Sequence, residues 1–274
     1  MVRRSFSILE SRVGLKSSSA TILIIEAKRF SFTILVTVAR YSNLSMISSI
    51  FALKLFKKSL KFVSTCDVIV HLAGVNRAET DEEVYGANIK LNTVIKKALI
   101  EANFKGHLLF ASSSQEKGDS IYGKAKKESR VLLEETINTH GGKFTGLIIP
   151  NVFGPFCKPN YNSFVATFCS KILNNETPEV IQDANVPLLY VGNLVEQILH
   201  VIEEPKAVLV EVEPDIVLKV SQVLSLLETF KKDYLDSNTI PSLQTPFELQ
   251  LFNTFRSYID MDQINPVPIV AHTD

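Results

Sequence analysis

HLLFASSSQEKGDSIYGKAK, residues 107–126, is the stretch that decides the fold. Its opening apolar run is typical of a strand, and three serines follow where that strand is expected to end. A polar loop then leads to Tyr122 and Lys126, whose spacing places them on one face of a helix, one turn apart. Strand, short loop and helix in this order predict part of a βαβ unit.

The pair Tyr122 and Lys126 suggests proton transfer. The pKa of a free tyrosine hydroxyl is about 10, so the group is a poor acid or base near neutrality. An ammonium beside it favours the phenolate and lowers that pKa. A serine from the preceding strand can then hold a substrate carbonyl against the Tyr122 hydroxyl while hydride arrives from a nicotinamide. The bare Y-x-x-x-K spacing also occurs by chance on exposed helices. The residues around it therefore determine how strongly it indicates catalysis.

Strand-like and helix-like patterns alternate through the rest of the chain. The apolar run Asp67–Ala73 predicts a parallel strand buried on both faces, and apolar residues every three or four positions predict a helix over Asp81–Ala102. Further strands are expected at His107–Ala111, Phe144–Ile149, Pro187–Val191 and Ala207–Val212. Further helices are expected at Ile121–His140, Phe164–Leu173, Leu194–Glu203 and Lys219–Lys232. This alternation predicts an α/β fold with a doubly wound, Rossmann-like parallel sheet.

Polar residues gather where three predicted strands end, at Gly74–Asn76, Ser112–Ser114 and Asn151–Gly154. In sheets of this class ligands bind at the carboxyl ends of the strands, so we expect a site there. Each group also has a purely structural interpretation. Gly74 and the asparagines suit turns, and the serines can satisfy backbone groups at the end of a strand.

Residues 1–65 differ from the rest, with thirteen serines and one glycine, Gly14. Strands are predicted at Thr21–Glu26 and Thr33–Val38, and a helix at Leu44–Phe62. The Gly and Asp residues that normally join such elements are almost absent. We interpret this segment as a degenerate first βαβ unit, the result of a shifted reading frame or a wrong start.

Composition excludes several classes of protein. The 274 residues are 46% hydrophobic and fit one α/β domain, or one and a half. Their net charge is zero, although residues 1–65 hold eleven basic and two acidic residues, and residues 66–274 hold 18 and 27. Because the basic residues are scattered, we expect no nucleic-acid or membrane partner. The apolar runs are too short for a bilayer, and the start lacks the features of a signal peptide.

Cysteines and histidines give no sign of a metal site. Cys66, Cys157 and Cys169 are odd in number and show no C-x-x-C, which indicates free thiols in a reducing compartment, expected to be the cytoplasm. The five histidines are scattered without metal-ligand spacing.

From about residue 66 to residue 274 the chain resembles the extended short-chain dehydrogenase/reductases, also called the NAD-dependent epimerase/dehydratase family. The matching features are DVIVHLAG (67–74), Asn88, the serines 112–114, YGKAK (122–126) and PNVFGP (150–155). HLAGVNRAE (71–79) and CKPNYNSFVATFC (157–169) resemble one subgroup more narrowly. Its members reduce a UDP-2-acetamido-2,6-dideoxy-hexos-4-ulose with NADPH in capsular polysaccharide synthesis.

The resemblance implies a role for each matching residue. Tyr122 would donate a proton to the C4 carbonyl, and Lys126 would lower the pKa of Tyr122 and hydrogen-bond the nicotinamide ribose. Ser113 best matches the catalytic serine, with Ser112 and Ser114 as alternatives. The residues implied in cofactor binding are Leu72, Ala73, Gly74, Asn88, Tyr122 and Lys126. Those implied in substrate binding are Asn76, Asn151, Asn160, Asn162 and Ser163.

The resemblance also implies partners. The cofactor would be NADP, with NAD as the alternative, and the substrate a nucleotide sugar used for capsule or O-antigen synthesis. The oligomeric state stays open, with a homodimer as one alternative. We expect residues 66–274 to form the reductase-like domain and residues 1–65 to match nothing in the family. The cupin domain that follows in the subgroup is not expected in this chain.

Three departures keep other functions open. The family begins with a strand and a G-x-x-G-x-x-G loop that binds the cofactor pyrophosphate, and only Gly14 is present here. The apolar Leu147–Ile149 replaces an arginine, and Gly192-Asn193 replaces an aspartate. The alternatives to a working reductase are therefore a non-catalytic remnant of such an enzyme and a sugar-nucleotide epimerase or dehydratase.

Overall fold

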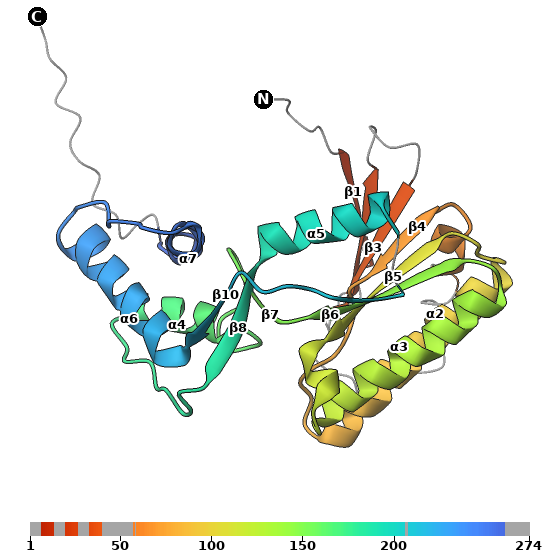
Figure 1. Cartoon of the computed structure of the whole chain (residues 1–274), viewed down its shortest axis with the longest axis horizontal. Helices are drawn as coiled ribbons and strands as arrows, with labels where there is room; N and C mark the ends of the chain where they lie inside the picture. The colour runs from red at the N-terminus through yellow and green to blue at the C-terminus, as the bar shows by residue number, and fades with distance from the viewer. Residues whose placement is uncertain are drawn as a thin grey trace, which may run out of the picture. The chain divides into compact units, whose positions relative to one another are not determined.

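The structure is a computed structural model that describes residues 7–13, 20–26, 33–39, 57, 59–205 and 208–260, the first three ranges by their backbone alone. The chain forms two compact units (Figure 1). Unit 1 comprises Met1–Ile149 and Ile198–Val212, and unit 2 comprises Pro150–Gln197 and Glu213–Asp274. The domain boundary expected at residue 65 stays a prediction.

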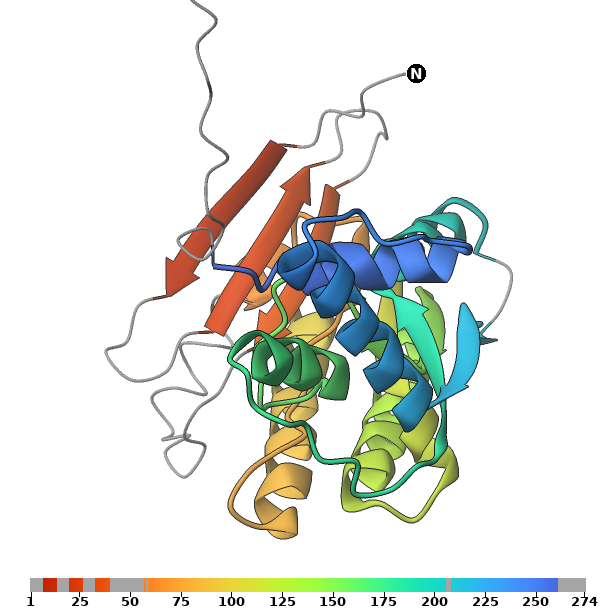
Figure 2. The ribbon, with the colours of Figure 1, turned by 90° about the vertical axis from the view of Figure 1, so that its left-hand side faces the viewer.

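Unit 1 is built on one sheet with the strand order β1-β2-β3-β4-β5-β6-β9. These strands are β1 (Ser7–Val13), β2 (Ala20–Glu26), β3 (Thr33–Ala39), β4 (Val68–His71), β5 (His107–Ser113), β6 (Lys143–Ile149) and β9 (Leu209–Glu211). From β3 onward every neighbouring pair is parallel. Helices α2 (Asp81–Glu101) and α3 (Ile121–Thr139) connect β4 to β5 and β5 to β6, and they lie side by side (Figures 1 and 2). These crossovers confirm the predicted Rossmann-like parallel sheet.

Burial explains why β4 and β5 read as continuous apolar runs. All four residues of β4 and the first six of β5 are buried. On one face of β5, Leu108 and Phe110 pack into a core with residues of α2 and α3, among them Leu99 and Leu133. A central parallel strand must be apolar on both faces because the elements packed on the two faces of the sheet exclude water from both.

The first three strands correct one expectation. The segments predicted at Thr21–Glu26 and Thr33–Val38 are strands, but β1 with β2 and β2 with β3 pair antiparallel, so the sheet is not parallel throughout. The reason is the length of the connections. Only residues 14–19 and 27–32 separate these strands, whereas a parallel crossover needs about a dozen residues. Most of the helix predicted at Leu44–Phe62 lies outside the described residues; residues 59–63 are helical.

Unit 2 contains a small sheet with the order β10-β8-β7. Its strands are β7 (Asn151–Phe153), β8 (Asn185–Tyr190) and β10 (Ile216–Lys219); β7 and β8 are parallel, and β8 and β10 are antiparallel. Its helices are α4 (Phe164–Leu173), α6 (Val220–Lys231) and α7 (Pro246–Arg256), with the short turn η2 (Lys232–Asp236) after α6. Aromatic side chains join α6 to α7, as in the pair Phe230 and Phe252, whose ring centroids are 5.3 Å apart. Helix α5 (Val191–Glu203) follows β8 directly, and its residues are divided between the two units.

The elements β7, β10 and α7, like β1, were not predicted. Among them, β7 and β10 are the short strands. The two strands have only three and four residues, too few to establish a periodicity. Helix α7 does carry a start signal that the sequence reading missed. Thr245 caps it by accepting a hydrogen bond from the Glu248 N–H, and Pro246 occupies its first turn.

Candidate active site

Lys126 lies on α3 with its ammonium inside unit 1. Its side chain is 2% exposed, and Nζ lies 4.3 Å from the centre of the Phe110 ring. Burial lowers the pKa of Lys126 to about 7, while the charge of Glu116 acts in the opposite direction. A lysine with this pKa changes charge near neutral pH, which is typical of lysines that act in catalysis.

The loop after β4 lies against Lys126 at Gly74. A Cβ added to Gly74 would stand 3.3 Å from Nζ of Lys126 and 3.3 Å from Oδ1 of Asn88. A side chain here would therefore crowd both polar groups. The structure thus brings together three of the residues predicted to bind the cofactor, Gly74, Asn88 and Lys126.

Asn88, on α2, holds the backbone just beyond Gly74. Its Oδ1 accepts a hydrogen bond from the Val75 N–H at 3.1 Å, and its Nδ2 donates to the carbonyls of Val75 at 2.6 Å and Val84 at 2.8 Å. Asn88 is fully buried, so these bonds satisfy an amide that has no access to water. This arrangement gives Asn88 a role in positioning the loop, and its direct contact with a cofactor stays a prediction.

The other predicted residues of this loop differ in exposure. Ala73 is buried, and Leu72 and Asn76 are half-buried. A further residue that the sequence did not single out, His71, ends β4 and lies beside Lys126 in the core. Its Nε2 is 2.9 Å from Oδ1 of Asn92, and burial together with the charge of Lys126 lowers the pKa of His71 to about 4.

Tyr122 lies in the first turn of α3 and corrects an expectation about its acidity. Burial raises the pKa of the Tyr122 hydroxyl, whereas the sequence argument expected Lys126 to lower it. The physical reason is desolvation, which disfavours the charged form of both groups: the phenolate of Tyr122 and the ammonium of Lys126. Tyr122 therefore keeps its proton at neutral pH in this structure.

The three serines at the end of β5 have distinct environments. Ser112 is buried and donates a hydrogen bond to Glu116. Ser113, the last residue of β5, accepts a hydrogen bond from the Gln115 N–H at 3.2 Å, and Ser114 begins the short helix η1 (Ser114–Lys117). The capping bond matches the structural interpretation of Ser113. A hydroxyl that accepts one bond can still donate one, so the catalytic role of Ser113 stays a prediction.

Gly123 allows the serine-bearing turn to pack directly on α3. A Cβ on Gly123 would stand 2.0 Å from the carbonyl oxygen of Gln115. Ser120 caps the same helix by accepting from the Gly123 N–H at 3.0 Å, and its hydroxyl donates to Oε1 of Gln115 at 3.2 Å. The glycine after Tyr122 thus fixes η1 against the start of the helix that carries Tyr122 and Lys126.

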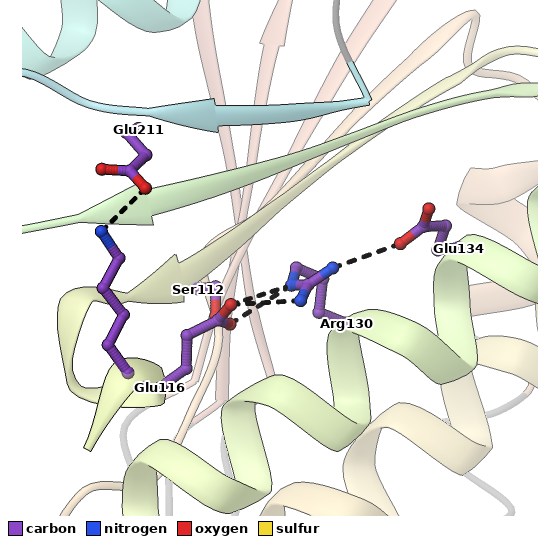
Figure 3. A network of polar contacts seen from close by, with 6 residues as sticks. Ser112, Glu116, Arg130, Glu134 and Glu211 are labelled. Atoms are coloured by element: carbon purple, nitrogen blue, oxygen red, sulfur yellow. Dashed lines mark hydrogen bonds and ion pairs between the residues drawn. The ribbon is translucent and has the colours of Figure 1, made fainter.

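A polar network that sequence reasoning missed ties the same elements together (Figure 3). Arg130 of α3 lies between two carboxylates, with Nη2 3.1 Å from Oε1 of Glu116 and Nη1 3.2 Å from Oε2 of Glu134. One signal was present in the sequence: Tyr122, Lys126, Arg130 and Glu134 follow at four-residue spacing and so share one face of the helix. The partner on η1, Glu116, had no local signal.

The remaining predicted substrate residues belong to unit 2. Asn151 begins β7 and is exposed, as are Asn160 and Asn162. Asn160 has φ 55°, a left-handed conformation that asparagine tolerates, and its N–H donates to Oγ1 of Thr167 at 2.9 Å. Ser163 is buried and caps α4 by accepting from the Ala166 N–H at 3.3 Å. Asn160 and Ser163 thus have structural roles, and their contacts with substrate stay predictions.

Unit 2 also supplies a carboxylate near the position where the sequence has Gly192-Asn193 in place of an aspartate. Oδ2 of Asp215 accepts from the Tyr190 N–H at 2.6 Å, and Oδ1 accepts from Nδ2 of Asn193 at 2.7 Å. Asp215 comes from the turn before β10, so no local pattern in the sequence pointed to it.

Two classes of site are not found in the described part of the chain. No three His, Cys, Asp or Glu residues there come together as a metal site would require. None of the helices described is both long enough and apolar enough to cross a bilayer.

Comparison with known proteins identifies relatives. The sequence model that describes the NAD dependent epimerase/dehydratase family matches residues 53–213 of this chain. A UDP-2-acetamido-2,6-beta-L-arabino-hexul-4-ose reductase from Pseudomonas aeruginosa is 30% identical over 217 residues, which cover 78% of this chain and 58% of the relative. The crystal structure of the capsular polysaccharide assembling protein CapF from Staphylococcus aureus is 33% identical with a TM-score of 0.67, and the match covers 76% of this chain and 57% of CapF.

A more distant structure shows the fold alone. UDP-glucose 4-epimerase from Thermotoga maritima, solved with UDP-glucose, is 19% identical with a TM-score of 0.63, over 74% of this chain and 81% of the epimerase. The chain spans less than three fifths of the length of the Pseudomonas and Staphylococcus relatives.

Proposed function

Because the chain belongs to the NAD dependent epimerase/dehydratase family, we propose that it is a nicotinamide-dependent reductase of a 4-keto sugar nucleotide. The Pseudomonas relative is named as a reductase of a UDP-linked hexulose, and the Staphylococcus relative as a protein of capsular polysaccharide assembly. By this likeness the substrate is a UDP-2-acetamido-2,6-dideoxy-hexos-4-ulose, and the product serves capsule or O-antigen synthesis.

The presence of Tyr122 and Lys126 one turn apart on α3, together with the named reductase relative, carries this proposal. Reduction of a ketone needs a proton donor at the carbonyl oxygen, and a buried tyrosine with a raised pKa holds its proton at neutral pH. An epimerase or a dehydratase of this fold instead begins by oxidising an alcohol, for which the tyrosine must act as a base. The name of the Pseudomonas relative supports the reductive direction over these alternatives.

Each residue then has a defined task. A reduced nicotinamide, when bound, supplies the hydride that converts the C4 carbonyl into an alcohol. Tyr122 transfers its hydroxyl proton to the carbonyl oxygen, which leaves a phenolate. Lys126, as an ammonium, stabilises that phenolate, and a serine hydroxyl at the end of β5 orients the carbonyl. Ser113 is the proposed serine.

Part of the site fits a nicotinamide cofactor. Gly74 lets the backbone after β4 approach Nζ of Lys126, where an added Cβ would be crowded, and Asn88 fixes that backbone. Lys126 would bind the nicotinamide ribose, and Leu72, Ala73 and Gly74 would run along the cofactor, with NADP proposed over NAD. The pyrophosphate end has no such support, because residues 40–73 contain no glycine.

That missing glycine loop supports a second candidate, a non-catalytic remnant of the same enzyme. In this candidate unit 1 folds and keeps Tyr122 and Lys126, but the chain binds dinucleotide too weakly to turn over. The two candidates differ in one measurable property, the affinity for NADPH.

Activity should be tested in two proteins, the chain as it stands and a chimera. In the chimera, the residues before β4 are replaced by the corresponding residues of the Pseudomonas relative. If either protein oxidises NADPH in the presence of the 4-keto sugar nucleotide, Tyr122→Phe should lower kcat by about 10²–10⁴-fold, the usual contribution of general acid catalysis. A Tyr122→Phe protein within about threefold of its parent would contradict the role of Tyr122. Lack of activity in the chain alone, with activity in the chimera, would favour the remnant.

A further inference from the structure

Glu116 is a shielded charged residue that contacts both Ser112 and Arg130. The side chain of Glu116 is only 7% exposed, although it ends in a charged carboxylate. The Ser112 hydroxyl donates to that carboxylate, and Nε of Arg130 lies 3.2 Å from both of its oxygens (Figure 3). A carboxylate so shielded from water persists only where positive charge and hydrogen bonds compensate it. Glu116 therefore holds three elements together: β5 through Ser112, η1 through its own backbone, and α3 through Arg130.

The four-residue spacing on α3 explains why a carboxylate is needed there. Lys126 and Arg130 are cations one turn apart on one face of the helix, an arrangement that is unfavourable by itself. Glu116 comes from another element and binds Arg130 directly. Its charge also acts on Lys126 and favours the ammonium.

The charged and titratable groups around Lys126 can be named from each element packed on it. In the described residues, the charge of Glu116 on η1 acts on Lys126, and the charge of Lys126 acts on His71 of β4; Tyr122 and Arg130 stand one turn before and one turn after Lys126 on α3. His71 is neutral above about pH 4, and Tyr122 is neutral while its pKa stays raised. Near neutral pH, Glu116 is thus the acidic group that balances Lys126.

We propose that Glu116 is a positioning residue of the active site, which holds the serine-bearing end of β5 against α3 and offsets the positive charge that Lys126 and Arg130 place on that helix. This inference rests on the proposed function, because it matters for catalysis only if Lys126 must stabilise the Tyr122 phenolate. Glu116 contacts Ser112 and Arg130, and it would act on the reaction through them and through Lys126.

The charge of Lys126 can be followed without cofactor or substrate, in the full chain as it stands. Protein with isotope-labelled lysine side chains gives one NMR signal for each amine, and the signal of Lys126 is the one lost in Lys126→Met. Glu116→Gln keeps the size of the side chain and removes its charge. We expect the titration midpoint of Lys126 to move below its starting value near pH 7.

Two further variants separate an electrostatic role from a merely structural one. Arg130→Met removes the neighbouring cation, so the midpoint of Lys126 should move to higher pH, opposite to the shift in Glu116→Gln. Glu116→Asp keeps the charge, so the titration midpoint of Lys126 should lie close to that of the unmodified protein. Glu211→Gln is the matched control and should leave the titration midpoint of Lys126 unchanged, because the ion pair of Glu211 is with the exposed Lys117, at 2.7 Å.

The outcomes are distinct. Shifts of opposite sign in the Glu116→Gln and Arg130→Met proteins support the proposal. An unchanged midpoint in both, or a shift of the same sign in both, overturns it. Because this titration needs no catalysis, failure of the reductase assay would not affect it. In an active chimera, Glu116→Gln should lower kcat at neutral pH and leave the KM for the sugar nucleotide within about twofold, whereas a larger rise in KM would argue for substrate contact.

Discussion

The carbonyl oxygen of Gln115 occupies the place that a side chain on Gly123 would need, 2.0 Å from the position of its Cβ. This contact joins the serine-bearing turn to the first turn of α3. It therefore sets the position of the serines relative to Tyr122, which precedes Gly123 in the helix. The contact involves backbone on both sides, so a change of rotamer cannot relieve a clash.

Gly123→Ala should consequently lower the unfolding free energy of unit 1 by about 1–3 kcal/mol, because α3 and η1 must separate to admit the methyl group. Gly86→Ala is the matched control, since Gly86 lies in α2 with nothing within 4 Å of an added Cβ. Alanine is the better helix former, so that protein should gain about 0.5–1 kcal/mol. Urea unfolding of the two variants measures both values. Equal effects of the two substitutions would show that η1 does not pack on α3 as described.

Asn88 gives a second prediction, about the loop beyond β4. Asn88→Ala removes three hydrogen bonds and leaves the buried N–H and C=O of Val75 without this partner, so unfolding free energy should fall by about 2–4 kcal/mol. Amide hydrogen exchange should reveal the cause, with faster exchange at the Val75 N–H. Thr93→Ala, on the same helix, removes one bond to the Ile89 carbonyl and serves as control. Unaltered exchange at Val75 in Asn88→Ala would contradict the clamp.

Two buried histidines predict how stability depends on pH. Burial lowers the pKa of His71 and of His107 to about 4, while an unfolded chain binds the same protons near pH 6.5. Between these values the unfolded state holds more protons, so stability should rise with pH from about 4 to 6.5 and be lost on acidification. Each histidine should contribute on the order of 3 kcal/mol to this loss.

His107→Gln tests this dependence with one substitution. His107 lies with Nε2 2.9 Å from Oγ1 of Thr145, and glutamine can replace that hydrogen bond without titrating. The slope of unfolding free energy against pH between 4 and 6.5 should become shallower in this variant. An identical slope would mean that His107 is already protonated in the folded state above pH 4.

How far the sequence predicts this molecule depends on the range of the interactions. The strands around Val70 and Leu109 and the helices after them were foreseen because their burial patterns are local and periodic. The pairing of the first strands and the partner of Arg130 depend on contacts between distant segments, which periodicity does not encode. The acidity of Tyr122 was predicted with the wrong sign, because spacing reveals a neighbouring charge but not the burial that opposes it.

The last prediction concerns the cofactor, and it follows from the sequence beside the central strands. In unit 1, β3 is the parallel neighbour of β4, and the chain after β3 would have to supply the backbone N–H groups that hold a pyrophosphate at a helix N-terminus. Residues 40–56 contain no glycine, so side chains would stand between that backbone and the phosphates. Gly74 and Lys126, which are proposed to contact the nicotinamide end, follow β4 in the chain and cannot replace a phosphate anchor.

If the chain is the non-catalytic remnant, calorimetry with NADPH should show no binding tighter than about millimolar in the 274-residue chain, equivalent to roughly −4 kcal/mol. Scattered lysines and arginines in residues 1–65 would give at most weak binding that disappears at high salt, because exposed charges are screened. The chimera with the first βαβ unit of the Pseudomonas relative is the control, and its affinity should rise into the micromolar range. A micromolar site that resists salt in the unmodified chain would remove the remnant as a candidate and leave the working reductase, with its pyrophosphate held by a backbone other than a glycine loop.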